Sequence, residues 1–282
     1  QHASEHFKKQ DYNVIATSRK KSSNDTIKIN LLEENHVFNM IKQLKPQYIL
    51  HLAGQNDVQS SWKDPYATLE ANVLMTLNIL EAVRQFQSKA KVIVVGSTLE
   101  ENLINPSHSH PYSLSKALQV IVSQRWADYF GLHIVIAKPV NLIGPGFSKG
   151  VCATFAKQVA KMEKQNESGR LTILNRSIKR DFLDVRDAVQ AYDILFHEGK
   201  KGETYEIGTG QLRSLVKIAK IYQQLATVTV ELDIKNNFIN ETIYSIDNTS
   251  IRALNWCPRY TLCQSLTDCL KFYRRCGGDQ VG

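Results

Sequence analysis

The stretch KVIVVGS (91–97) is an apolar, largely β-branched run that ends in two small residues. Such a run is typical of a strand buried on both faces of a sheet. The segments on either side are helical in pattern: 65–86 begins with a proline, and 113–131 ends with a glycine. A buried strand between two helices predicts one repeat of a parallel α/β sheet.

The same alternation extends along the chain in both directions. Strands are expected at 12–18, 48–54 and 133–141, and further helices at 1–10 and 31–46. Because the strands are continuous apolar runs, helices should cover both faces of the sheet. Right-handed crossovers then give an α/β fold with a doubly wound, Rossmann-like parallel sheet.

The pattern loosens in the second half of the chain. Short strands at 171–174, 204–208 and 228–234 mix with helices, which predicts a smaller mixed α/β lobe. We expect a truncated Rossmann domain at 1–145 and a lobe at 146–282, with part of the latter returning to the sheet.

The beginning of a Rossmann sheet is expected to lie before the first residue. Such a sheet opens with a strand and a Gly-rich turn that sets a cofactor pyrophosphate on a helix N-terminus. Here the chain begins inside what reads as that first helix. We expect a fragment, or numbering from an internal residue, with the glycine loop just before Gln1. The alternative is a protein without the loop, which would bind the cofactor poorly.

Composition narrows the class of protein. The net charge of +8 suits anionic small ligands, since the basic residues are scattered and form no nucleic-acid-binding signature. No apolar run approaches the ~20 residues of a membrane span, and the N-terminus lacks a signal-peptide core, so a cytoplasmic protein is expected. The five cysteines form no C-x-x-C pair and have no histidine at zinc spacing. We expect reduced thiols and no metal site.

A series of short motifs gives the chain its most specific signature. They are HLAGQ (51–55), NVLMTLNILEAV (72–83), VVGST (94–98), PYSLSK (111–116), KPVNLIGPG (138–146), KRDFLDVRDAVQAY (179–192) and LNWCPRYTL (254–262). Each is weak alone. In this order, over essentially the whole chain, they resemble the extended short-chain dehydrogenase/reductase family, which comprises epimerases, dehydratases and reductases of nucleotide sugars.

The resemblance implies that Ser97, Tyr112 and Lys116 are catalytic. A phenol has a pKa of about 10, and a cation within ~4–6 Å lowers it. Lys116, one helical turn after Tyr112, lies on the same helix face, so Tyr112 is suited to give a proton to a sugar oxygen. In the family the lysine also binds the nicotinamide ribose, and Ser97 would hydrogen-bond the sugar oxygen.

The resemblance implies a nicotinamide cofactor, and the residues after the second strand favour NADP(H) over NAD(H). The second strand ends in Ser18, Arg19 and Lys20, where an NAD site usually carries an acidic residue, and a guanidinium suits a 2′-phosphate. The alternative is a solvated basic turn. The other expected cofactor-binding positions, besides Tyr112 and Lys116, are Asn30, Leu31, Leu52, Ala53, Gln55, Asn72 and Pro139.

The residues after Ser97 bear on the reaction. The segments 61–65, 141–163 and 179–192 resemble most closely the branch of the family that reduces GDP-4-dehydro-6-deoxy-D-mannose, and more distantly GDP-mannose 4,6-dehydratases. The resemblance to dehydratases would demand a glutamate two positions beyond the catalytic Ser/Thr, but Leu99 stands there and cannot act as a base. Glu100 is one step on, and a shift could bring it closer. A reductase of a GDP-4-keto-6-deoxyhexose is therefore expected.

Further residues are expected to bind the nucleotide sugar. The resemblance implies Ser97, Thr98, Asn141, Lys157 and Arg180, and the cationic groups of Lys157 and Arg180 suit a diphosphate. Lys157 could equally be an exposed position on an amphipathic helix. Asp184 and Asp187 are expected to be structural, Asp184 as a helix cap.

Two departures from the family pattern keep alternatives open. The segment after Ser97 lacks the usual Tyr-Gly, and NNFINET (236–242) stands where relatives carry Arg-Pro-x-Asp. A 4,6-dehydratase or 4-epimerase, or a degenerate member with only a binding role, remain alternatives. The resemblance also implies a homodimer in which helices 65–86 and 113–131 form a four-helix bundle with their copies.

Overall fold

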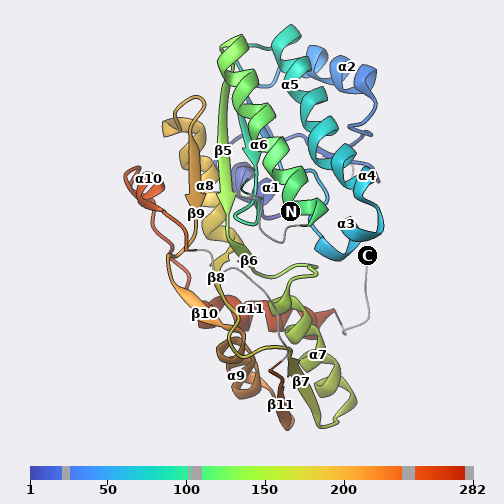
Figure 1. Ribbon diagram of the computed structural model, residues 1–282, viewed down its shortest axis with the longest axis vertical. Helices are drawn as coiled ribbons and strands as arrows, with labels where there is room; N and C mark the ends of the chain where they lie inside the picture. The colour runs from blue at the N-terminus through green and yellow to red at the C-terminus, as the bar shows by residue number, and fades with distance from the viewer. Residues whose placement is uncertain (21–25, 101, 103–109, 237–244, 277–282) are drawn as a thin grey trace. The chain divides into compact units, whose positions relative to one another are not determined.

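The computed structural model describes residues 1–20, 26–100, 102, 110–236 and 245–276. The chain divides into two compact units. The first unit comprises Gln1–Pro139 and Val189–Glu206, and the second comprises Val140–Ala188 and Ile207–Gly282. Figure 1 follows the chain through both by colour.

The first unit is built on a parallel sheet. Its strand order is β3-β4-β5-β9, with bounds Tyr48–His51, Lys91–Val95, His133–Pro139 and Thr204–Ile207. β3, β4 and β5 run parallel in direct register. A separate parallel pair consists of β1 (Ala16–Ser18) and β2 (Thr26–Lys28). The α/β, Rossmann-like class predicted from the alternating pattern is confirmed.

Helices lie on both faces of this sheet. They are α1 (His2–Lys9), α2 (Glu34–Leu44), α3 (Val58–Lys63), α4 (Pro65–Leu69), α5 (Met75–Phe86), α6 (Pro111–Phe130) and α8 (Val185–Glu198). Val92 and Val94 of β4 share one buried core with α2, α5 and α6. Because side chains alternate along a strand, Lys91 faces the other way, and its Nζ donates to Phe196 O of α8 (2.9 Å).

The helix predicted over 65–86 carries a feature that periodicity does not reveal. Residues Glu70–Leu74 form a π turn between α4 and α5. A π turn inserts one extra residue and rotates the side chains that follow. Asn72, one of the predicted cofactor residues, lies inside this turn and is fully buried.

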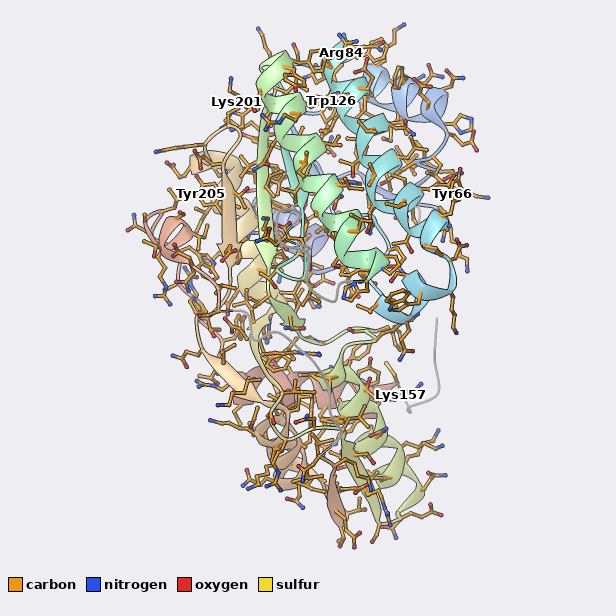
Figure 2. The ribbon with its side chains drawn as sticks, viewed as in Figure 1. Tyr66, Arg84, Trp126, Lys157, Lys201 and Tyr205 are labelled. Atoms are coloured by element: carbon orange, nitrogen blue, oxygen red, sulfur yellow. The ribbon has the colours of Figure 1, made fainter. Side chains whose placement is uncertain are left out.

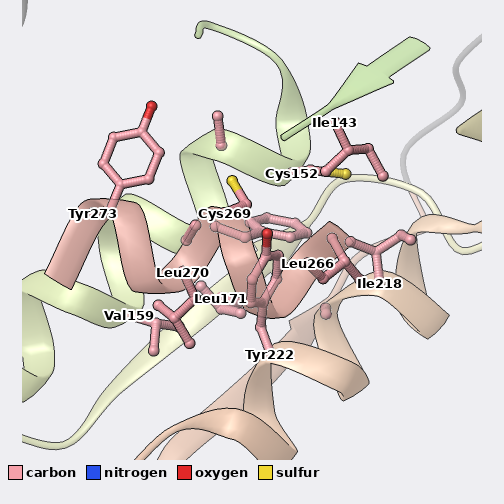
Figure 3. Close-up of a cluster of buried hydrophobic side chains, with 14 of the residues drawn as sticks. Ile143, Cys152, Val159, Leu171, Ile218, Tyr222, Leu266, Cys269, Leu270 and Tyr273 are labelled. Atoms are coloured by element: carbon pink, nitrogen blue, oxygen red, sulfur yellow. The ribbon is translucent and has the colours of Figure 1, made fainter. Parts of the chain in front are cut away.

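The second unit is a mixed lobe with its own core. Its strands are β6 (Asn141–Ile143), β7 (Gly169–Ile173), β8 (Lys179–Asp184), β10 (Leu212–Ser214) and β11 (Val230–Ile234). Its helices are α7 (Val151–Gln165), α9 (Leu215–Leu225), α10 (Thr249–Arg252) and α11 (Leu262–Arg275). β8 pairs with both β6 and β10, and β7 pairs with β11. Figure 3 shows the core, where Leu171, Tyr222 and Leu266 are fully buried.

All five cysteines are free, with Cys152 and Cys269 buried in the core of the second unit. Among the described residues, no helix combines the length and the apolar character that a membrane span needs.

Candidate active site

Tyr112 is fixed at the second position of α6 by the residues around it. Pro111 takes the first helical position, and the N-cap His110 accepts a hydrogen bond from Ser113 N (2.9 Å). Ser97 lies just beyond the end of β4, and its side chain is hydrogen-bonded to Tyr112. Both side chains are buried. The fold therefore brings the serine from the sheet edge to the tyrosine at the helix start.

The pKa of Tyr112 differs from what the sequence predicts. We expected Lys116 to lower it, but burial raises it, and the hydrogen bond from Ser97 is what opposes the rise. The reason is the direction of the Lys116 side chain, whose Nζ donates to Val95 O (2.9 Å) and to Gln119 Oε1 (2.8 Å). A phenol with a raised pKa keeps its proton at neutral pH, the state that a proton donor requires.

Lys116 is itself buried beside the sheet edge. Burial lowers its pKa to about 8, while the charge of Glu100 acts in the opposite direction. Val95 O and Gln119 Oε1 occupy two of the three ammonium donors, which leaves one for another acceptor.

Glu100 lies closer to this cluster than its sequence position suggested. Its carboxylate pairs with Lys138 of β5, and Oε2 is buried without a hydrogen-bond partner among the described residues. Burial raises the pKa of this carboxyl, and Lys138 opposes the rise. Leu99, by contrast, is 43% exposed, and Thr98 is half-buried.

The loop after β3 is held beside Lys116. Asn72 accepts from Gln55 N (2.8 Å) and donates to Gln55 O (3.0 Å) and to Ser115 Oγ (2.8 Å). A β-carbon on Gly54 would lie 2.5 Å from Asn72 Oδ1 and 3.9 Å from Lys116 Nζ, so only glycine fits this close approach. Asn72 thus ties the loop to α6.

The outer side of this loop is open. Leu52 is 52% exposed and Ala53 is also exposed, although both directly follow a strand of the central sheet. An exposed apolar residue on a loop whose Gly54 approaches a lysine with a spare donor suits a group with a flat ring and hydroxyls. A nicotinamide ribose is such a group, so the residues here fit the cofactor that the sequence predicts.

The basic residues after β1 are also open. Arg19 and Lys20 are exposed, and Ser18 Oγ shapes their turn by accepting from Lys20 N (3.2 Å) and donating to Lys20 O (2.6 Å). Both cations are therefore available to an anionic ligand.

The remaining predicted cofactor positions serve partly as structure. Asn30 Oδ1 accepts from Leu32 N (3.2 Å), and the Leu31 side chain belongs to the core. Asn78 of α5 donates to Leu31 O (2.9 Å), which anchors this loop to the helix. Pro139 closes β5 and is half-buried.

The predicted substrate residues beyond Thr98 lie in the second unit. Asn141 of β6 donates to Asp181 O of the neighbouring β8 (3.1 Å), and Arg180 lies on the same strand β8. Lys157 is half-buried and lies on α7, where Figure 2 labels it. The structure thus brings Asn141 and Arg180 together on paired strands, with Lys157 on a separate helix.

Two aspartates act structurally, as the sequence predicts. Asp184 Oδ1 accepts from Arg186 N (2.9 Å) at the start of α8, which confirms it as a cap. Asp187 accepts from Arg259 N (3.0 Å) and Tyr260 N (3.1 Å) and so holds the LNWCPRYTL segment.

Two residues of interest were missed in the sequence. Arg213 of β10 stands opposite Arg180 in the antiparallel pair, which doubles the positive charge there. Gln119, one turn beyond Lys116, carries no motif of its own. The position of Arg213, two residues after TGQ (209–211), was a usable signal in the sequence. Nothing in the sequence marked Gln119. The NNFINET segment lies outside the described residues except for Asn236.

Comparisons with known proteins agree with this geometry. A model of the NAD dependent epimerase/dehydratase family matches residues 1–208. The GDP-6-deoxy-D-mannose reductase of Pseudomonas aeruginosa is 31% identical over 215 residues, which cover 72% of this chain and 70% of that protein.

Solved structures share the fold. The structure of RMD from Pseudomonas aeruginosa complexed with NADPH has a TM-score of 0.79 at 28% identity, covering 87% of each chain. The UDP-glucose 4-epimerase of Thermotoga maritima, solved with UDP-glucose, has a TM-score of 0.84 at 21% identity, covering 98% of this chain and 95% of that one.

Proposed function

The chain belongs to the NAD dependent epimerase/dehydratase family, and we propose that it reduces the 4-keto group of a GDP-4-keto-6-deoxyhexose with NADP(H). The observation that carries the proposal is the buried cluster of Ser97, Tyr112 and Lys116 at the sheet edge. The similarity to GDP-6-deoxy-D-mannose reductase supports the substrate class.

Each residue of the cluster has a role in this reaction. The bound nicotinamide cofactor supplies a hydride to C4 of the sugar. As the C4–O π electrons move to oxygen, Tyr112 gives its phenolic proton to that oxygen and later regains one from solvent. Ser97 holds the reacting oxygen, and the remaining donor of the Lys116 ammonium would bind the nicotinamide ribose.

The direct test uses purified protein, NADPH and GDP-4-keto-6-deoxymannose. We expect NADPH absorbance at 340 nm to fall only when the keto sugar is present, with one reduced sugar formed for each NADPH consumed. No NADPH consumption, with the cofactor shown to bind, would overturn the proposal.

A 4,6-dehydratase is the second candidate, because Glu100 supplies a buried carboxylate near Lys116. Such an enzyme recycles its cofactor, so it would convert a GDP-hexose without net change in NADPH. Turnover of the unreduced hexose with constant absorbance at 340 nm would favour it, and a 4-epimerase would behave in the same redox-neutral way.

The preference for NADP(H) is proposed from Arg19. Arg19→Glu is expected to raise the Kd for NADPH by about 10- to 100-fold, as loss of a charge-assisted hydrogen bond does. The Kd for NADH should change much less, since NADH lacks the 2′-phosphate. Fluorescence titration of both cofactors measures this.

Lys89→Glu is the matched control, because Lys89 is also exposed but precedes β4 at the opposite end of the strand. Equal losses for NADPH in the two variants would point to a general charge effect and contradict the assignment of Arg19.

The nucleotide sugar is proposed to contact Asn141, Lys157 and Arg180 of the second unit, besides Ser97 and Thr98. Arg213, opposite Arg180, adds a second guanidinium suited to a diphosphate.

A homodimer is proposed as the assembly. Leu74, Leu114 and Ile121 are exposed apolar residues on the helical run 65–86 and on α6, and α5 packs against α6 within the protomer. Light scattering should give about twice the protomer mass of 32.0 kDa, and Ile121→Lys should reduce it to that of one chain. A cytoplasmic location stays an expectation.

A further inference from the structure

A buried network of hydrogen-bonded side chains leads from Lys116 to Gln119, Thr76 and His51. Lys116 Nζ donates to Gln119 Oε1 (2.8 Å), and Gln119 Nε2 donates to Thr76 Oγ1 (2.8 Å). His51 Nε2 lies 2.9 Å from the same Thr76 oxygen. Gln119 and Thr76 are completely buried and His51 nearly so. Side chains from α6, α5 and β3 thus meet behind the lysine.

The donors and acceptors of this network can be assigned in only one consistent way. The Thr76 hydroxyl gives its only hydrogen to Asn72 O (2.7 Å), so its oxygen must accept from Gln119 and His51. Burial lowers the pKa of His51 to about 3, and Lys116 adds to the effect, so His51 stays neutral and can donate through Nε2. If the Gln119 amide flipped, its NH2 would face the ammonium and its oxygen would face an acceptor. The network therefore holds Oε1 toward Lys116.

Several charged or titratable groups surround Lys116. His51 of β3 is neutral, and Tyr112 on α6 keeps its proton. Glu100 attracts the ammonium, but its carboxylate is already paired with Lys138. Besides Glu100, Gln119 and the Val95 carbonyl are the groups that favour the charged amine, and only the two side chains can be varied.

We propose that Gln119 is a positioning residue that keeps Lys116 protonated and aimed at the edge of the sheet. Gln119 contacts Lys116 alone among the three proposed catalytic residues, and it acts through that contact. The inference rests on the role of Lys116 in the proposed function, but it does not depend on which sugar is reduced.

The test is a direct titration of Lys116 without cofactor or substrate. Protein labelled with 13C at the lysine ε-carbon is titrated by NMR, and the Lys116 signal is identified by its absence from Lys116→Met. Gln119→Met, which cannot accept, should lower the Lys116 midpoint by about one pH unit, as loss of a hydrogen bond to a charged group does. Gln119→Glu should raise it by about one unit or more.

Gln124→Met is the matched control, because Gln124 also lies on α6 but donates to Thr204 Oγ1 (3.2 Å). In this variant the titration midpoint of Lys116 should equal that in the unaltered protein. If a Gln119 variant does not fold, Thr76→Val serves instead, since it frees the amide to rotate and should lower the midpoint, whereas Thr76→Ser should preserve it.

Midpoints that stay unchanged, or that move in the same direction in both Gln119 variants, would overturn the inference. The outcome is separable from that of the proposed function. If the Lys116 midpoint moves in opposite directions in the two Gln119 variants but the protein shows no NADPH-dependent turnover, the positioning role is supported and the reductase is rejected. If turnover is normal and the midpoints are unchanged, the reductase is supported and the positioning role is rejected.

Discussion

Tyr112→Phe is expected to lower kcat for keto-sugar reduction by about 10²- to 10⁴-fold, the usual contribution of a positioned general acid. The change removes one oxygen and leaves the ring that packs at the start of α6. Tyr112 is buried, and Ser97 is its side-chain hydrogen-bond partner.

Steady-state kinetics with saturating NADPH give kcat, and fluorescence titration gives the Kd for NADPH, which should change little. Tyr129→Phe is the control, since Tyr129 lies on the same helix but is 69% exposed. A Tyr112→Phe variant that keeps more than a tenth of the activity would assign the proton to another donor.

Much of the fold was predictable because its signals are local. The apolar run 91–97 and the helix segments 65–86 and 113–131 each carry their own periodicity, and the structure places β4, α5 and α6 there. The π turn at Glu70–Leu74 was not predictable, since it depends on tertiary contacts. Asn72 shows these tertiary contacts most clearly, because its side chain is hydrogen-bonded to Gln55 and Ser115, which lie outside the turn.

Within the candidate site, spacing in the sequence relates only residues that lie a few positions apart. Tyr112 and Lys116 share one helix face, so spacing alone relates them. Glu100 reaches the cluster through a turn and a contact with Lys138, and Gln119 matters because Thr76 and His51 fix its amide. These relations join residues that are distant in sequence, and no local pattern records them.

The effect of burial on Tyr112 has the same origin. From the sequence, a nearby lysine should lower the pKa of a phenol. In the folded chain, desolvation dominates because the ring is enclosed and the ammonium is bonded elsewhere. The sign of such a shift depends on the full surroundings of both groups.

Lys116→Met is expected to lower activity without lowering stability. Methionine keeps the apolar stem but removes the ammonium donor that would hold the nicotinamide ribose in place beside the sugar, so we expect kcat to fall by about 10²- to 10³-fold. The Kd for NADPH should also rise, because the free ammonium donor is lost.

The stability of Lys116→Met should move in the opposite direction from its activity. Burial lowers the pKa of Lys116 from 10.5 to about 8, so at pH 7 folding must bury a charged amine, which costs up to ~3 kcal/mol. Methionine avoids that cost, although Gln119 loses a partner. We expect the free energy of unfolding at pH 7 to match or exceed that of the unaltered protein.

The pH dependence of the free energy of unfolding tests whether Lys116 is a buried cation. Between pH 8 and 10.5 the unfolded chain holds a proton that the folded Lys116 has lost, so the unaltered protein gains stability relative to Lys116→Met by about 1.4 kcal/mol per pH unit. Denaturant unfolding at pH 7, 8 and 9.5 measures this, with Lys161→Met, an exposed lysine of α7, as the control. If the variant loses both activity and stability, and the stability difference between the two proteins stays constant from pH 7 to 9.5, Lys116 would be a structural residue, because only a buried cation couples its charge to folding in this way.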